Sequence, residues 1–263
     1  MIMDSIKISS WNVNGIRACF NKGAFFDYLD DKEPDILFLQ ETKAHVSDIP
    51  PELDNPKGYY TEWFSAEKKG YSSVAIFTKL KPVQIFKGFG VDRFDREGRV
   101  IGAEFKDFIA FGVYFPNGQM SDERLQYKLD FFDAFFSYTN DLVASGKNIL
   151  ILGDYNIAHK AIDLARPKQN ETVSGFLPVE RAWMDKIVDE FGYVDTFRQF
   201  NQNAEEYSWW NYRTRARSRN VGWRIDYTFV NRAFSDRIKD AFIQQDVNGS
   251  DHCPVGVSLS YGS

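Results

Sequence analysis

Short apolar segments rich in β-branched and aromatic residues recur along the whole chain. Runs of this length, bounded by Gly, Pro, Asp or Asn, predict β-strands that are buried on one or both faces. The expected strands cover residues 6–8, 36–39, 74–77, 108–114, 149–152, 227–230 and 255–259.

Two segments between these strands have the three- and four-residue spacing of apolar positions that is typical of an amphipathic helix. The first follows Ser121, a predicted N-cap, and ends at Gly146. The second starts with Pro178 at its first position, and its apolar stripe is Val179, Trp183, Ile187 and Phe191. Strands and helices alternate with no linker, repeat or low-complexity tract between them. We therefore expect one mixed α/β domain over residues 1–263.

Composition supports a globular protein. The 263 residues are 43% hydrophobic and 26% charged, which excludes a disordered or collagen-like chain. No apolar run approaches the roughly 18 residues of a membrane helix. The start of the chain lacks a basic segment followed by an apolar one, so we expect no secretory leader. Cys19 and Cys253 have neither CxxC nor metal-type spacing, which favours a reducing cytoplasm.

Polar side chains follow several predicted strands at the point where each strand stops. Asn12 and Asn14 follow the first strand, Glu41 the second, and Asp154 and Asn156 the strand at 149–152. Residues two apart in an extended chain face the same way, so each of these pairs can point into one space. Asp and Asn also form turns after strands, but several such strand ends together favour a convergent site.

The C-terminal part of the chain adds Asp226, Asp251 and His252. A histidine beside a carboxylate, with a second aspartate to orient it, suits acid–base or phosphate-stabilising chemistry. We interpret His45 and His159 as structural or exposed. The chain has no G-x-S-x-G turn, P-loop or G-x-G-x-x-G motif.

Oxygen donors predominate among the candidate metal ligands, which are Glu41, Asp154, Asp226, Asp251 and neighbouring Asn carbonyls. Such donors predict a hard cation, Mg²⁺ or Mn²⁺. A hard cation that also binds substrate phosphate suggests hydrolysis of a phosphodiester or phosphomonoester.

Residues 207–224 form a basic and aromatic segment without an acid, in a chain of net charge −5. The segment holds five arginines and three tryptophans: Arg213, Arg215, Arg217, Arg219, Arg224, Trp209, Trp210 and Trp223. Arginines bind phosphates and aromatic rings cover a sugar or base. We therefore favour contact with DNA over a solvated loop.

Nine stretches, in order along nearly the whole chain, carry a family resemblance: residues 11–17, 34–43, 69–75, 94–99, 114–118, 153–159, 174–176, 220–227 and 250–254. In them the sequence resembles the exonuclease III family of class II apurinic/apyrimidinic (AP) endonucleases, within the endonuclease/exonuclease/phosphatase superfamily. The resemblance implies a four-layered α/β sandwich of the DNase I-like type. Two packed mixed sheets would be flanked by helices, with the site at one rim.

The resemblance also implies the metal site and its neighbours. Glu41 would be the principal Mg²⁺ ligand, with Mn²⁺ as a substitute. Asn14 and Asp251 would support the ion directly or through water. Asn12 completes the metal set, and Asn12, Tyr114 and Asn117 would position the scissile phosphate.

The resemblance further implies the catalytic groups. Asp154, helped by Asn156, would orient and deprotonate the attacking water. His252, paired with Asp226, would bind the scissile phosphate and offset its developing charge. Tyr114 would also assist the leaving oxygen.

The DNA-binding residues expected from the resemblance and the basic segment are Asn117, Asn170, Trp209, Arg213, Arg219, Trp223 and Ile225. Trp209, Trp223 and Ile225 would form the apolar pocket for a flipped-out abasic sugar. Two positions depart from the family pattern. Val173 stands where many relatives have a DNA-contacting asparagine, and Met120 where some have an arginine.

These features predict a Mg²⁺-dependent AP endonuclease that cleaves 5′ to an abasic site, with 3′→5′ exonuclease or 3′-phosphodiesterase activity. Its partner would be duplex DNA with abasic sites or blocked 3′ ends. We expect a monomer without membrane contact, in the cytoplasm and at the nucleoid through its substrate. One alternative keeps the chemistry but acts on any DNA or on a phosphoinositide or sphingomyelin. Another is a DNA-binding protein that has lost catalysis, which the competent side chains at the expected catalytic positions disfavour.

Overall fold

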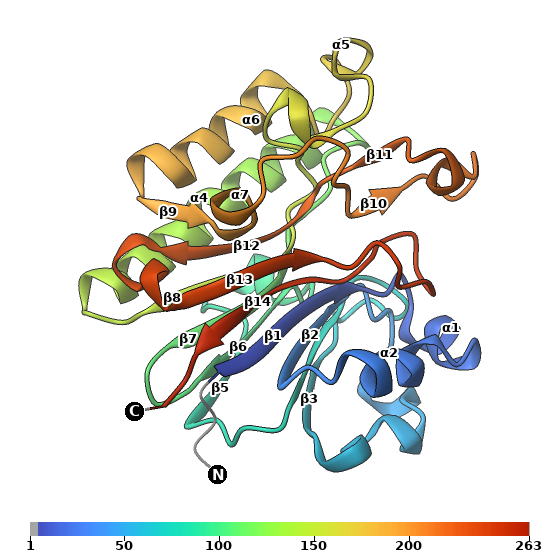
Figure 1. Ribbon diagram of the computed structural model, residues 1–263, viewed down its shortest axis with the longest axis vertical. Coiled ribbons are helices and arrows are strands. Elements are labelled where there is room, and N and C mark those ends of the chain that lie inside the picture. Colours follow the sequence, from blue (N-terminus) through green and yellow to red (C-terminus); the bar gives the residue numbers. More distant parts are fainter. Residues whose placement is uncertain (1–4, 263) are drawn as a thin grey trace.

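Two six-stranded sheets pack face to face in the computed structural model, which describes residues 5–262 (Figure 1). Residues 1–4 and 263 lie outside the described residues. The expectation of no secretory leader falls partly on residues 1–4. The first sheet has the order β13 (Ile238–Ile243), β14 (Val255–Ser260), β1 (Ser5–Asn12), β2 (Ile36–Gln40), β4 (Val74–Thr78) and β3 (Tyr60–Phe64). The second has the order β5 (Gln84–Lys87), β6 (Val100–Glu104), β7 (Ile109–Tyr114), β8 (Ile149–Asp154), β12 (Asp226–Asn231) and β9 (Tyr193–Asp195).

Both sheets are mixed. The pairs β1–β2 and β7–β8 are parallel, whereas their neighbours in each sheet pair antiparallel. A two-stranded ladder, β10 (Trp209–Trp210) and β11 (Gly222–Trp223), stands apart from them.

Helices cover the outer faces of the two sheets. The α-helices are α1 (Ile16–Asn21), α2 (Ala24–Lys32), α3 (Asp92–Asp95), α4 (Asp122–Ala144), α5 (Pro167–Asn170), α6 (Pro178–Asp185) and α7 (Thr196–Phe200). Short helical turns are η1 (Val46–Asp48), η2 (Pro51–Leu53), η3 (Pro56–Gly58), η4 (Ala161–Asp163), η5 (Lys186–Glu190), η6 (Ala216–Arg219) and η7 (Arg232–Arg237). Within residues 5–262, no helix is long and apolar enough to cross a membrane.

The alternation of side chains along β2 shows how the layers form. Ile36 and Phe38 pack between the two sheets, whereas Leu37 and Leu39 pack under α1 and α2. A third apolar layer, rich in phenylalanine, lies between the second sheet and α4. Because successive residues of a strand face opposite ways, the apolar residues of β2 fill the layers on both sides of its sheet. The predicted four-layered α/β sandwich is confirmed.

The expected strands are all present, and the helix after Ser121 is confirmed. The Ser121 hydroxyl accepts a hydrogen bond from the backbone N–H of Arg124 at 3.2 Å. The predicted stripe of the second helix is partly wrong, because Val179 is exposed and the buried face carries Glu180 instead. Glu180 can be buried because it pairs with Lys128 of α4.

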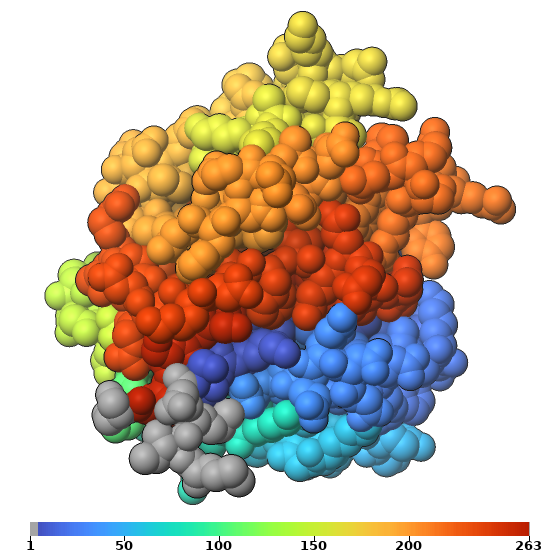
Figure 2. Space-filling view, viewed as in Figure 1, coloured from blue at the N-terminus to red at the C-terminus, as the bar shows by residue number. Residues whose placement is uncertain are grey.

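The carboxyl-terminal ends of β1, β2, β7 and β8 lie at one edge of the sandwich. The pairs β1–β2 and β7–β8 are parallel, and Asn12 at the end of β1 bonds to Asp154 at the end of β8. In the space-filling view, β1 (blue) lies beside the C-terminal strands (red), and the segments around α5 (yellow) and β10 (orange) project above and to the right (Figure 2). These two segments border the cleft described next.

Candidate active site

A cleft of about 570 Å³ lies at this edge and collects most of the residues that the sequence predicted. Its lining includes Asn14, Glu41, Tyr114, Asn117, Asp154, Asn156, Asn170, Trp209, Trp223, Ile225, Asp251 and His252. Side chains from positions 14 to 252 therefore meet in one space.

The amide of Asn12 joins the two sheets beneath this cleft. Its Nδ2 donates to Oε1 of Glu41 and to Oδ2 of Asp154, each at 2.9 Å. Its Oδ1 accepts from the backbone N–H of Asn14 at 3.0 Å. Asn12 is fully buried, and its amide group is committed to these bonds. The structure therefore places it behind the two carboxylates, which it orients.

The turn after β8 fixes the carboxylate of Asp154. Oδ1 of Asp154 accepts the backbone N–H of Asn156 at 2.8 Å, and Asn156 has a left-handed backbone with φ 53°. Asn117 donates to Oδ1 of Asn156 at 3.0 Å. Gly153 is required just before this turn, because a Cβ there would lie 1.9 Å from the carbonyl oxygen of Val113. The turn after β8 and its contacts with neighbouring strands thus set the position of Asp154.

His252 lies between two aspartates that face each other across β8 and β12. Its Nδ1 is 2.9 Å from Oδ2 of Asp226, and its Nε2 is 3.8 Å from Oδ2 of Asp154. Ser208 donates to the same oxygen of Asp226 at 2.6 Å. The ring therefore has one nitrogen tied to Asp226 and the other directed to the Asp154 side.

Burial and neighbouring charges shift the pKa values of these groups. Burial alone lowers the pKa of His252, but Asp226 and Asp154 outweigh it and raise that pKa to about 10. Burial, Asp226 and Glu41 raise the pKa of Asp154 to about 7 against the opposing charge of His252. Burial raises the pKa of Glu41, yet Lys43 and Asn12 outweigh it and hold that pKa below its usual value.

The donor set fits a hard divalent cation. Glu41, Asp154 and His252 offer atoms that all lie within 4.8 Å of one another. Because Nδ1 of His252 is held by Asp226, the oxygens of Glu41 and Asp154 are the better donors for an oxygen-seeking ion. Negative charge exceeds positive charge there, so a cation would relieve the repulsion between the carboxylates.

Asn14 and Asp251 lie beside this group and bond to each other, Nδ2 to Oδ1, at 2.9 Å. Lys43 was not among the predicted site residues, but its Nζ lies 3.0 Å from Oε2 of Glu41 and also contacts Oδ1 of Asn14. Its place in the Gln40–Lys43 strand end was the available signal. Ser208, the partner of Asp226, gave no such signal because it is buried between aromatic residues.

One wall of the cleft is apolar. Trp209 and Trp223 face each other across β10 and β11, with their ring centroids 6.3 Å apart at 85°. Ile225 packs in the same cluster. Trp209 also donates from Nε1 to Oδ2 of Asp251 at 3.1 Å. Trp209 therefore joins the apolar wall to Asp251, which lies beside the carboxylate group.

The remaining predicted DNA contacts lie at or beyond the rim. Asn170 lines the cleft and donates to the carbonyl of Arg166 at 2.9 Å. Arg213 and Arg219 are exposed and do not line the cleft. Val173 lines the rim at 37% exposure, and Met120 is 89% exposed.

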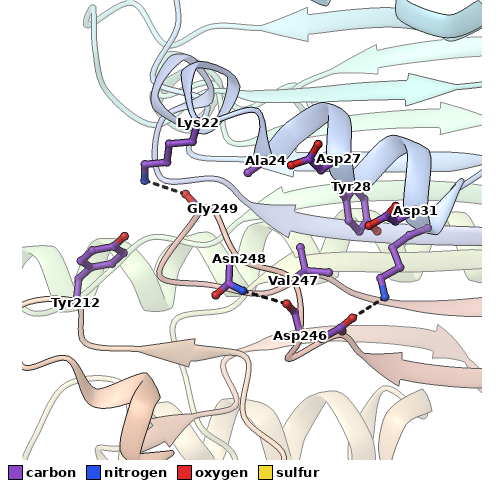
Figure 3. Close-up of a pocket in the computed structure, with 11 residues that line it drawn as sticks. Lys22, Ala24, Asp27, Tyr28, Asp31, Tyr212, Asp246, Val247, Asn248 and Gly249 are labelled. Atoms are coloured by element: carbon purple, nitrogen blue, oxygen red, sulfur yellow. Dashed lines mark hydrogen bonds and ion pairs between the residues drawn. The ribbon is translucent and has the colours of Figure 1, made fainter.

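A second cavity, of about 490 Å³, lies between α2 and the segment 246–249 (Figure 3). Lys22 reaches across it to the carbonyl of Gly249 at 3.2 Å, and Lys32 pairs with Asp246 at 2.6 Å. Its lining includes none of the group Glu41, Asp154 and His252. This cavity is therefore separate from the candidate active site.

Known proteins are similar to this chain over nearly its whole length. The model of the endonuclease/exonuclease/phosphatase family matches residues 9–252. An exodeoxyribonuclease of Bacillus subtilis is 44% identical over 97% of this chain and 100% of its own length. A DNA-(apurinic or apyrimidinic site) endonuclease of Dictyostelium discoideum is 40% identical over 97% of this chain and 70% of its own. The structure of a 3′ phosphatase from Neisseria bound to a product DNA hairpin matches with a TM-score of 0.88 and 28% identity, over 97% of this chain and 100% of that one.

Proposed function

This chain belongs to the exonuclease III/AP endonuclease family of DNA repair nucleases, within the endonuclease/exonuclease/phosphatase superfamily, and on that premise we propose that it incises duplex DNA at abasic sites. Water adds to the phosphorus on the 5′ side of the lesion, and the bond from phosphorus to the 3′-oxygen breaks. The products are a 3′-hydroxyl and a 5′-deoxyribose phosphate. The observation that carries this proposal is the meeting of Glu41, Asp154 and His252 in one cleft with an apolar wall.

Asp154 takes the proton of the attacking water in this proposal. Its pKa of about 7 suits a base that works near neutral pH. Asn12 and Asn156 hold its two oxygens, so the carboxylate is oriented before the substrate arrives.

His252 stabilises the negative charge that develops on the phosphate oxygens. Its raised pKa keeps it protonated at neutral pH, and Asp226 holds its ring. A fixed positive charge stabilises a nearby negative charge more strongly in a buried site than in water. Tyr114 and Asn117, which line the same cleft, bind the phosphate, and Tyr114 assists the leaving oxygen.

Glu41 is the residue that would hold Mg²⁺, or Mn²⁺ in its place, with Asn14 and Asp251 supporting its water ligands. When bound, the ion would offset charge on the phosphate oxygens as a Lewis acid. The oxygen-rich donor set supports this choice over zinc, which favours nitrogen and sulfur ligands.

The apolar wall provides the selectivity for a missing base. A nucleotide without its base is extruded from the duplex at low cost, and Trp209, Trp223 and Ile225 offer it an apolar surface. Arg213 and Arg219 are exposed, as groups that bind the DNA backbone outside the pocket must be. Asn170 contacts the strand from the rim.

A second activity, removal of 3′-terminal nucleotides or 3′ blocks, uses the same cleft. The relatives named as an exodeoxyribonuclease and a 3′ phosphatase support it. Exposed Met120 and Val173 offer neither charge nor an amide to hold a continuous duplex, which favours the exchange of DNA ends.

The chain is further proposed to be one domain that acts as a monomer in the cytoplasm. Both sheets contribute to the candidate site, so the two halves must fold together. A single unfolding transition and a monomeric mass on size exclusion would support this part of the proposal, and two separate transitions would contradict it.

The test is a panel of end-labelled duplexes that carry one abasic site, one uracil, one 3′-phosphate or no lesion, together with a lipid phosphodiester. We expect Mg²⁺-dependent incision 5′ to the abasic site, leaving a 3′ end that a polymerase extends. Asp154→Asn is the matched control, and it should bind the abasic duplex without cutting it. Equal cutting of intact and abasic duplex would indicate a nonspecific nuclease, and hydrolysis of the lipid alone would refute the proposal.

A further inference from the structure

Arg99 holds Tyr114 at both its backbone and its ring. The backbone N–H of Tyr114 donates to the carbonyl of Arg99 at 2.9 Å. Nη1 of Arg99 donates to the carbonyl of Tyr114, also at 2.9 Å. The guanidinium lies 4.7 Å from the centroid of the Tyr114 ring, within the range of a cation–π contact.

Arg99 is itself fixed by a cluster of half-buried side chains that was not used in the proposed reaction. It is 2% exposed, its Nε donates to Glu97 at 2.5 Å, and its Nη2 donates to the hydroxyl of Tyr71 at 2.8 Å. Arg124 of α4 donates to both carboxylate oxygens of Glu97, at 2.9 and 2.8 Å, and to the same Tyr71 hydroxyl at 2.9 Å. Two arginines thus share one carboxylate and one hydroxyl.

The segment that contains Tyr71 also supports the strand end that carries Glu41. The carbonyls of Ser72 and Ser73 accept from the backbone N–H groups of Lys43 and Thr42, each at 3.0 Å. The cluster therefore connects Tyr114, at the end of a strand of the second sheet, to the Glu41 segment of the first.

A direct contact of Arg99 with DNA is disfavoured, because its side chain is enclosed while its hydrogen bonds all go to protein groups. The stacking of its charge on a ring that lines the cleft gives Arg99 a contact through which it can restrain that ring. Burying a guanidinium is costly unless it is fully paired, and this one is paired in a way that restrains one cleft residue.

We propose that Arg99, oriented by Glu97, is a positioning residue that fixes the Tyr114 ring in the cleft. This inference rests on the proposed function, because it assigns its effect to the step in which Tyr114 contacts the phosphate. A small misplacement of such a group lowers the rate strongly.

A double-mutant cycle tests the proposal, with single-turnover cleavage of abasic duplex as the readout. Arg99→Met should lower the rate roughly 10- to 100-fold. In a Tyr114→Phe background, where there is no hydroxyl left to position, Arg99→Met should cost less than about threefold. Arg99→Lys, which keeps the charge, should recover part of the rate. Non-additivity of this kind identifies residues that act through each other.

Arg198→Met is the matched control, because Arg198 also pairs with a buried carboxylate but belongs to a different cluster. Arg198→Met should change the cleavage rate by the same factor in the wild-type protein and in the Tyr114→Phe background. If Arg99→Met is equally damaging in both backgrounds, the positioning role is refuted. If Arg99→Met does not fold, Glu97→Gln is carried through the same cycle with the same criteria.

A readout that needs no activity separates this inference from the proposed function. In DNA-free protein with ¹³C-labelled tyrosine, Arg99→Met should shift and broaden the ring signals of Tyr114 and leave those of Tyr193 unchanged. Unchanged Tyr114 signals would overturn the inference even if the enzyme cuts abasic DNA. Altered signals in a protein that cuts none of the DNA substrates would support it while the proposed function fails.

Discussion

Nδ1 of His252 lies 2.9 Å from Oδ2 of Asp226, while Nε2 of the same ring lies 3.8 Å from Oδ2 of Asp154. The two aspartates are paired residues of β12 and β8, so the register of the second sheet sets the distance between them. One ring therefore carries a positive charge that Asp226 maintains and that faces the proposed base. Replacing Asp226 should therefore reduce the positive charge on His252 and leave its ring in place.

Asp226→Asn is expected to lower the rate of incision about 100-fold or more, because an amide does not stabilise the protonated ring. Single-turnover cleavage of abasic duplex measures this loss, and gel shift in chelator should show that DNA binding persists. Ser208→Ala removes one hydrogen bond to the same carboxylate and should cost less than about tenfold. A rate for Asp226→Asn within twofold of wild type would contradict the assignment.

Removal of divalent metal should stop cleavage and leave the fold intact. Glu41→Gln should raise the Mg²⁺ concentration needed for half-maximal activity, because a neutral amide replaces the carboxylate in the cluster with Asp154 and His252. Activity titrated against Mg²⁺ and against Mn²⁺ measures the shift. Asp48→Asn, at an exposed position outside the cleft, is the control and should leave the titration unchanged. Full activity in chelator would remove the metal from the mechanism.

Much of the candidate site could be predicted from local sequence. Glu41, Asp154 and Asn156 stand directly after apolar runs, and those runs form strands because they are buried on both faces. The polar residues at their ends then reach one edge of the sandwich. Parallel pairing aligns the ends within β1–β2 and within β7–β8, and the packing of the two sheets brings the two pairs together at Asn12 and Asp154.

Other features depend on contacts that no local pattern contains. Asn12 faces two carboxylates from different sheets, so its role follows from the way the sheets pack. Arg213 was predicted from composition together with Arg219, but composition does not show whether a side chain points into a cleft or away from it. Arg99 was recognised only as part of a matching stretch, because its function lies in a cross-strand contact with Tyr114.

Lys128 and Glu180 form an ion pair that is completely buried, with Nζ 2.6 Å from Oε1. Nζ also donates to the carbonyl of Asn156 at 2.8 Å. Lys128→Met should lower the free energy of unfolding by about 3–5 kcal/mol, because it leaves a buried carboxylate without its cation. Denaturant titration measures the loss, and Lys128→Met/Glu180→Gln should recover part of it. A loss below about 1 kcal/mol would show that the pair is dispensable.

Asp163 should make folding stability depend on acid pH. Burial raises its pKa, but Arg224 and Arg198 outweigh burial and hold that pKa below the usual value. A carboxyl group whose pKa is lowered by folding stabilises the fold above its unfolded pKa of about 3.9, and this contribution is lost as the pH falls through the folded pKa. Asp163→Asn should therefore lower the free energy of unfolding by about 3 kcal/mol at pH 7. The difference from wild type should shrink below about pH 4. Ile187→Ala, at a buried position without charge, is the control, and its difference from wild type in free energy of unfolding should stay constant over this pH range. A constant difference for Asp163→Asn as well would show that the ion pairs of Asp163 do not stabilise the fold.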